Sequence, residues 1–146
     1  MVVKRYRTTA IIAKQRPQHP LWWVGSSRKD IRNFPESVRH LLGRALQIVQ
    51  HGGQPVGARQ LKGFDGTAIF EISAASSDGT YRLVYFVLPG VAAVVLHAFQ
   101  KKSRSGRQTP LHHIRLIKER LKRAEQEHAS EIKPKPQTYR QDRDPD

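Results

Sequence analysis

The chain has 146 residues, and its 26 Lys and Arg against 12 Asp and Glu give a formal net charge of +14. This length suits one domain and excludes a cofactor enzyme with a separate substrate lobe. The chain contains no cysteine, which excludes disulfides and thiolate zinc sites, and no apolar run approaches the roughly 20 residues that cross a bilayer.

The first 21 residues are basic, with five Lys or Arg and no acidic residue. Because Pro17 and Pro20 interrupt them, we expect an extension with little order at residues 1–21, with an edge strand at residues 2–6 as the alternative. The longest apolar stretch in this segment, residues 10–13, is far too short for a secretory signal. We therefore expect a cytoplasmic protein.

A short strand and two helices are expected next. The apolar run at residues 21–24 predicts the strand, and Ser27 with Asp30 resembles a capping box that opens a short helix. Pro35 ends that helix and suits the first position of the next one, which ends at Gly52–Gly53. The apolar residues of this second helix have helical spacing and predict one buried stripe. The stripe consists of Val38, Leu41, Leu42, Ala45, Leu46 and Val49.

Three strands and a last helix complete the predicted order. Residues 68–73, 81–88 and 91–99 have the composition of strands, and their connections are too short for crossovers, so the strands should be antiparallel. Thr109–Pro110 begins the last helix. Its apolar stripe is Ile114, Ile117, Leu121 and Ala124.

This order predicts an α+β fold, with two N-terminal helices packed on an antiparallel meander sheet and a basic C-terminal helix. We expect the helices on one face of the sheet and a ligand on the other face. The predicted domain spans residues 22–128. The polar, proline-containing residues 129–146 predict a disordered tail.

Positive charge is concentrated between residues 97 and 123, which contain nine basic residues and one acidic residue. Basic residues that served only to keep the protein soluble would be spread along the chain. Their concentration in one segment therefore favours a polyanionic partner. The adjacent histidines His112 and His113 cannot share one helix face as metal ligands. We therefore expect neither a metal nor a cofactor.

The strands also contain residues suited to chemistry. Arg82 begins a central strand and should project from its open face. On the last strand, simple alternation places Leu96 and Ala98 on one face, and His97, Phe99 and Lys101 on the other. A strand with one apolar face and one mixed face suits a sheet that binds a substrate.

Several strings of the sequence together resemble the RelE/ParE superfamily of toxins from bacterial toxin–antitoxin pairs. These strings are YRLVY, LHAFQKKS and the basic helix after them; WWVGSSRKDIRNFPESVRHLLGRAL and QLKGFDG resemble the phage-derived, HigB-like branch. The resemblance covers about residues 21–128. It implies a small RelE-like fold, ribosome-dependent mRNA cleavage and neutralisation by a cognate helix-turn-helix antitoxin.

The resemblance also implies roles for individual residues. Arg82 lies where these toxins place a phosphate-binding arginine, and Lys101 and Lys102 lie at the strand end that faces the scissile phosphate. On the first meander strand, however, this chain has Glu71 and Ser73 where such toxins have basic residues. The general base is therefore left open. The residues expected to contact RNA are Lys62, Arg104, Arg107, Arg115, Lys118 and Lys122.

Cleavage of RNA without a metal ion uses the 2′-hydroxyl as an internal nucleophile and needs groups that move protons and stabilise phosphoryl charge. Arg82 suits the stabilisation of charge. Lys101 or Lys102 suits an acid or base, because neighbouring cations lower the pKa of a lysine. Glu71 or His97 is the alternative base.

Two other functions remain compatible with these features. One is a ParE-like inhibitor of DNA gyrase, which binds without catalysis. The other is a non-catalytic basic protein that binds RNA or the ribosome. Fold alone does not separate these functions, and the lysine-rich strand end with YRLVY favours RNA cleavage.

Overall fold

The computed structural model describes residues 19–101 and 108–132. The alternative edge strand at residues 2–6 lies outside the described residues, as do Lys102, Arg104, Arg107 and most of the predicted tail. Within that tail, Ala129–Ile132 forms the short helix α5, directly after α4 (Leu111–Glu127). Helical structure therefore continues past the predicted domain boundary at residue 128.

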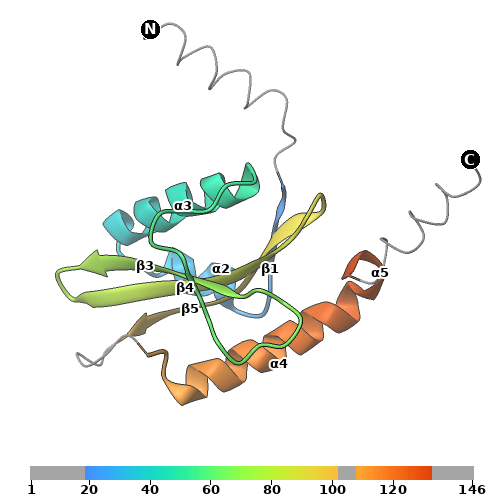
Figure 1. The fold of residues 1–146 in the computed structure, drawn as a ribbon. Coiled ribbons are helices and arrows are strands. Elements are labelled where there is room, and N and C mark those ends of the chain that lie inside the picture. The colour runs from blue at the N-terminus through green and yellow to red at the C-terminus, as the bar shows by residue number, and fades with distance from the viewer. Residues whose placement is uncertain (1–18, 102–107, 133–146) are drawn as a thin grey trace, which may run out of the picture.

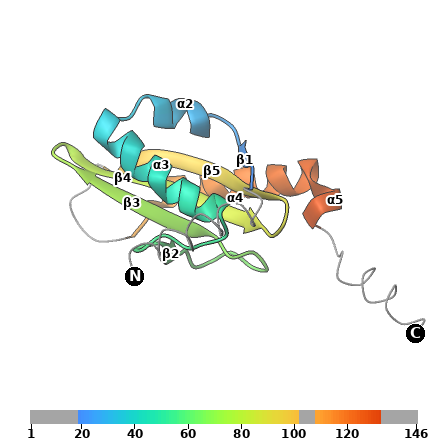
Figure 2. The same ribbon diagram turned by 90° about the horizontal axis from the view of Figure 1, so that it is seen from above.

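The centre of the fold is a mixed five-stranded sheet with the strand order β1-β5-β4-β3-β2. Strands β3, β4 and β5 pair antiparallel, as predicted, whereas β1 joins the edge of the meander parallel to β5. Figure 2 shows these strands side by side beneath α3. The strands are β1 (Leu21–Trp23), β2 (Arg59–Gln60), β3 (Phe70–Ser76), β4 (Gly79–Leu88) and β5 (Ala92–Lys101).

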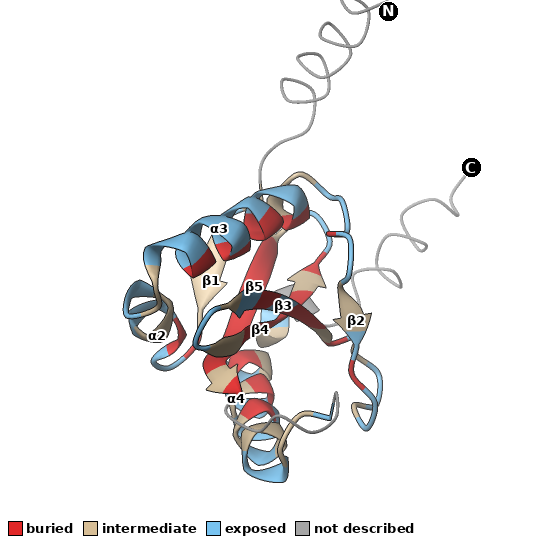
Figure 3. Ribbon diagram, turned by 90° about the vertical axis from the view of Figure 1, so that its left-hand side faces the viewer, coloured by how far each residue is buried: buried red, intermediate tan, exposed pale blue. Residues whose placement is uncertain are grey.

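Helices cover both faces of this sheet. Helix α3 (Glu36–Gln50) lies on one face and α4 on the other (Figure 1). The expectation that one face stays open for a ligand is therefore wrong, although the α+β class is confirmed. The reason lies in β4 and β5, which bury apolar residues on both of their faces, and each apolar face requires a covering layer. Figure 3 shows the buried sides of both helices turned toward the sheet.

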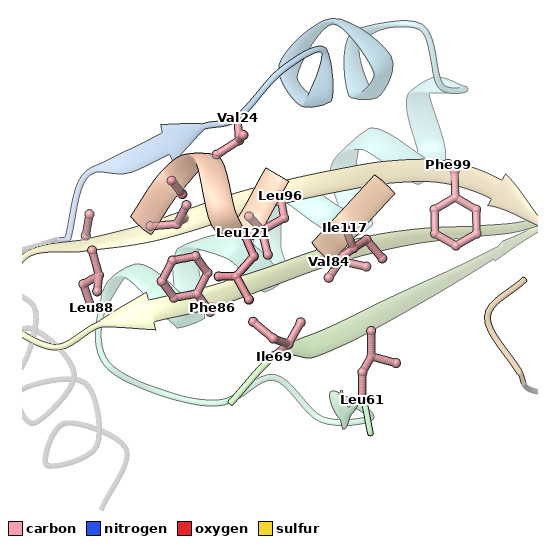
Figure 4. Close-up of a cluster of buried hydrophobic side chains, with 13 residues drawn as sticks. Val24, Leu61, Ile69, Val84, Phe86, Leu88, Leu96, Phe99, Ile117 and Leu121 are labelled. Atoms are coloured by element: carbon pink, nitrogen blue, oxygen red, sulfur yellow. The ribbon is translucent and has the colours of Figure 1, made fainter. Parts of the chain in front are cut away.

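Each face has its own hydrophobic core. The core under α4 contains Val84, Phe86, Leu96, Phe99 and Ile117, among other residues (Figure 4). The core under α3 consists of Val38, Leu42, Ala45, Leu46, Val49, Ile72, Ala74, Tyr81, Leu83, Tyr85, Ala93 and Val95. Two full apolar layers on a small sheet explain how a strongly basic chain still folds.

The helix predictions need two corrections. Leu41 was expected in the buried stripe of α3, but it is 51% exposed, because it lies at the edge of the stripe and turns away from the sheet. The prediction of a capping box at Ser27 and Asp30 is also wrong. Ser27 is the first residue of α2 (Ser27–Arg32), and its buried hydroxyl donates to the carbonyl of Val95 (3.2 Å), while the hydroxyl of Ser26 donates to Asp30 (2.8 Å).

A β-bulge in β5 changes which side chains share a face. His97 is paired with Val84 and Val95 with Tyr85, so Leu96 is an extra residue between them. Leu96 therefore lies in the same core as Phe99, against the simple alternation that placed them on opposite faces. Beyond the bulge, alternation resumes, and Phe99 lies directly opposite Arg82.

Candidate functional site

Charged side chains from four strands meet on the α4 side of the sheet. We call Arg59, Glu71, Arg82, Lys101 and Thr109 the Glu71 cluster. The register explains this arrangement: Arg59 on β2 is paired with Glu71 on β3, and Arg82 on β4 lies opposite a residue two positions after Glu71. The last residue of β5, Lys101, and the loop residue Thr109 before α4 complete the cluster.

Glu71 is the centre of this cluster. It is 2% exposed, and its Oε1 accepts a hydrogen bond from Nη2 of Arg59 at 2.7 Å. The same oxygen lies 3.2 Å from Nη1 of Arg82, and Oε2 accepts a hydrogen bond from the hydroxyl of Thr109 at 2.7 Å. Both carboxylate oxygens are therefore engaged, an arrangement that suits positioning of the arginines more than proton transfer.

The cluster has more positive than negative charge. Three cations, Arg59, Arg82 and Lys101, surround the single carboxylate of Glu71, so their formal net charge is +2. Arg82 and Lys101 are only 7% and 6% exposed. Burial lowers the pKa of Lys101, and the charge of Arg82 lowers it further, whereas Glu71 opposes the shift. Such a site favours an anionic ligand.

A groove of about 450 Å³ runs beside the cluster. Arg59 and Thr109 belong both to the cluster and to its wall, and the predicted RNA contact Lys62 lines the same groove. Two residues after Lys62, the ring of Phe64 lies with its centre 5.7 Å from the ammonium group of Lys118 on α4. The remaining groove residues are Gln60, Leu61, Gln108 and Ile114.

The structure thus brings several predicted residues together and separates others. Glu71, Arg82 and Lys101 lie in one cluster, Lys62 lines the groove beside it, and Lys118 lies near Phe64. Arg115 and Lys122 are exposed on α4. Lys102, Arg104 and Arg107 lie outside the described residues.

The structure buries His97 beneath a second histidine. His97 is 5% exposed, and its Nε2 lies 2.8 Å from Nδ1 of His113. Burial lowers the pKa of His97 to about 4, and the charge of Arg120 contributes to the shift. His97 therefore belongs to a pair next to Phe99, whose ring stacks on both histidines.

Sequence reasoning missed three residues of this region. His113 precedes Ile117 by four residues, and this helical spacing alone places it on the face of α4 that meets the sheet. Arg59 and Thr109 had no comparable signal, because their places depend on the pairing of β2 and on the path of the chain into α4.

Two kinds of feature are absent from the part of the chain that the structure describes. Among residues 19–101 and 108–132, no three His, Asp or Glu side chains are grouped as a metal site would require. In the same part of the chain, no helix combines the length and apolar character of a membrane span.

Comparison with known proteins places this geometry in context. Residues 29–122 match the model of a family described as phage-derived, Gp49-like proteins. A solved structure of the E. coli toxin RelE, a double arginine-to-alanine mutant in the free state, is similar at 24% sequence identity and a TM-score of 0.49. That similarity covers 73% of this chain and 97% of the RelE chain. No curated protein matches the chain.

Proposed function

The chain belongs to the phage-derived Gp49-like family, and we propose that it is a RelE-type toxin, a ribosome-dependent endoribonuclease that cleaves mRNA. A toxin of this type has an antitoxin partner, and we assign that role to a cognate helix-turn-helix protein. The single observation that carries the proposal is the net charge of +2 in the buried Glu71 cluster. A phosphodiester would neutralise part of this charge.

The proposed reaction uses the 2′-hydroxyl of the RNA as the nucleophile. Its oxygen attacks the adjacent phosphorus, the bond from phosphorus to the 5′-oxygen breaks, and protons leave the first oxygen and reach the second. Arg82, aligned by Glu71, stabilises the charge that develops on the phosphoryl oxygens. Lys101 exchanges a proton with the reacting oxygens, supported by its lowered pKa. Lys102 remains its proposed partner at the strand end.

Basic residues outside the cluster would hold the RNA backbone. Lys62 lines the groove, and Lys118 faces the same loop from α4. Arg115 and Lys122 extend this basic surface along α4, and Arg104 and Arg107 are proposed to extend it between β5 and α4. Contacts of this kind add affinity without reading sequence, and they weaken as salt is raised.

The test is single-turnover cleavage of mRNA on saturating ribosomes. We expect Arg82→Ala to reduce cleavage by about 10²–10³-fold, the usual effect of removing one such donor. Arg82→Lys should restore it only in part, because a point charge cannot replace a two-pronged contact. Ribosome binding should persist. Arg44→Ala is the matched control, because Arg44 is exposed on α3, across the sheet from the cluster.

Two results would contradict the proposal. If the Arg82→Ala variant cleaves at the parental rate, β4 does not hold the reacting phosphate. Failure of the parental protein to cleave, together with inhibition of DNA gyrase, would instead support the gyrase-inhibitor alternative.

A further inference from the structure

A chain of hydrogen bonds leads from α2 through α4 to the histidine pair. The hydroxyl of Ser26 donates to Oδ2 of Asp30 at 2.8 Å and accepts from Nη2 of Arg120 at 3.0 Å. Nη1 of Arg120 lies 3.0 Å from the carbonyl oxygen of Leu96 and 3.2 Å from Nδ1 of His97. The guanidinium is therefore fixed against β5 from two sides.

Arg120 determines which nitrogen of His97 carries the proton. A guanidinium has donors and no acceptor, so Nδ1 of His97 must accept. In the neutral ring the proton then lies on Nε2, which donates to Nδ1 of His113 across 2.8 Å. By the same reasoning, the proton of neutral His113 lies on its own Nε2.

His113 lies beside the Glu71 cluster. Its ring stacks on Phe99 at a centroid distance of 3.8 Å, and Phe99 is the strand partner of Arg82. Thr109, four residues earlier in the loop before α4, donates to Glu71. His113 itself is only partly buried, in contrast to His97.

We infer that Arg120 and His97 are positioning residues that hold His113 as a neutral Nε2–H hydrogen-bond donor for a phosphate oxygen beside the Glu71 cluster. This inference rests on the proposed function for the identity of the ligand, a phosphodiester. It also gives His97 a role other than the general base, because both of its ring nitrogens are already engaged.

Burial, with a smaller effect of neighbouring cationic groups, keeps both rings neutral. Burial lowers the pKa of His113 to about 4, His112 lowers it further, and Glu71 on β3 opposes the shift. For His97, burial and Arg120 lower the pKa, while Asp30 on α2 opposes them. The donor should therefore persist unchanged from about pH 5.5 to pH 8.

Gly25 provides the space in which Arg120 lies. A Cβ atom at this position would come within 2.8 Å of Nε of Arg120, and the backbone φ of +58° also disfavours a side chain. Gly25→Ala should therefore displace Arg120 without altering either ring. This variant separates the effect of positioning from any effect of changing the histidines.

The first experiment is ¹⁵N NMR of the imidazoles in the full chain. We expect both His97 and His113 as neutral Nε2–H tautomers from pH 5.5 to pH 8. Arg120→Gln and Gly25→Ala should shift His97 toward a mixture of tautomers, and Arg120→Lys should restore the parental signal in part. Inorganic phosphate should shift the Nε2–H signal of His113. These results do not require cleavage, so they test the inference even if the proposed function fails.

The second experiment is cleavage on saturating ribosomes. His113→Phe keeps a ring on Phe99 but removes the donor, and we expect cleavage to fall about 10- to 100-fold, the equivalent of a hydrogen bond to a charged group. His113→Gln should recover part of the loss, because its amide can donate. His40→Phe is the matched control, because His40 is exposed on α3.

The inference would be overturned by an Nδ1–H tautomer of His113, by titration of this ring near pH 6.5, or by a phosphate-insensitive His113 signal. Parental cleavage by His113→Phe, under conditions in which Arg82→Ala has lost activity, would also overturn it and would leave the proposed function intact.

Discussion

Glu71→Gln removes one negative charge from the Glu71 cluster and keeps the length of the side chain. Both Glu71 and Arg82 are buried, and loss of one partner from a buried ion pair costs about 3–5 kcal/mol. The pair with Arg59 adds about 1 kcal/mol or less, because the side chain of Arg59 is 42% exposed. We therefore expect the free energy of unfolding to fall by about 3–5 kcal/mol, with most of the loss at the buried pair.

The assay is urea denaturation at pH 7 and 25 °C, with Arg59→Gln as the matched control. Arg59→Gln should lose about 1 kcal/mol or less, because it removes only the exposed partner. Sulfate should stabilise Glu71→Gln more than the parental protein, because the cluster then has three cations and no carboxylate. Equal losses in the two variants would refute the reasoning that Glu71 is the buried counter-ion of Arg82.

Two further predictions concern acid stability and the basic helix. The pKa of His97 is lowered to about 4 in the folded protein, so its contribution to stability is fully present above pH 6.5 and falls between pH 6.5 and 4, by at most about 1.4 kcal/mol per pH unit. His97→Gln should flatten this part of the profile of unfolding free energy against pH, and an unchanged slope would show that His97 does not titrate in this range. Reversing two exposed charges of α4, with Arg115→Glu and Lys122→Glu, should weaken ribosome binding and reduce its salt dependence. Single-turnover cleavage at saturation should be spared, and a matching loss of cleavage would place these residues in the reaction itself.

The sequence predicted local structure well where one periodicity governed it. The α3 stripe was correct at Val38, Leu42 and Val49, and the short connections correctly indicated the antiparallel meander. The parallel pairing of β1 with β5 could not be predicted, because it joins segments about 70 residues apart with no turn between them. The packing of α4 on the second face of the sheet could not be predicted either. It depends on apolar residues on both faces of β4 and β5, and an alternating pattern does not indicate such strands.

The site was predictable only as separate residues. Glu71, Arg82 and Lys101 were chosen by residue type, and strand pairing brings them together. The alternation of side chains along β5 does not predict the bulge at Leu96. One extra residue reverses the face on which every residue before it is expected to lie. The contact between His97 and His113 requires both that bulge and the covering of this face by α4. Which of these residues lie together therefore depends on tertiary structure and could not be predicted from residue types.

The arrangement of these groups explains how an acidic residue can lie in the proposed phosphate site. Glu71 accepts hydrogen bonds from Arg59 and Thr109 and forms an ion pair with Arg82, so its carboxylate orients two cations while positive charge stays in excess. In the proposed role of the histidine pair, both ring nitrogens of His97 are engaged and His113 supplies a fixed donor. Burial lowers the pKa of Lys101, so this lysine gives up its proton more readily than an exposed lysine does. Proton exchange in the proposed reaction is therefore assigned to Lys101, and charge stabilisation to Arg82.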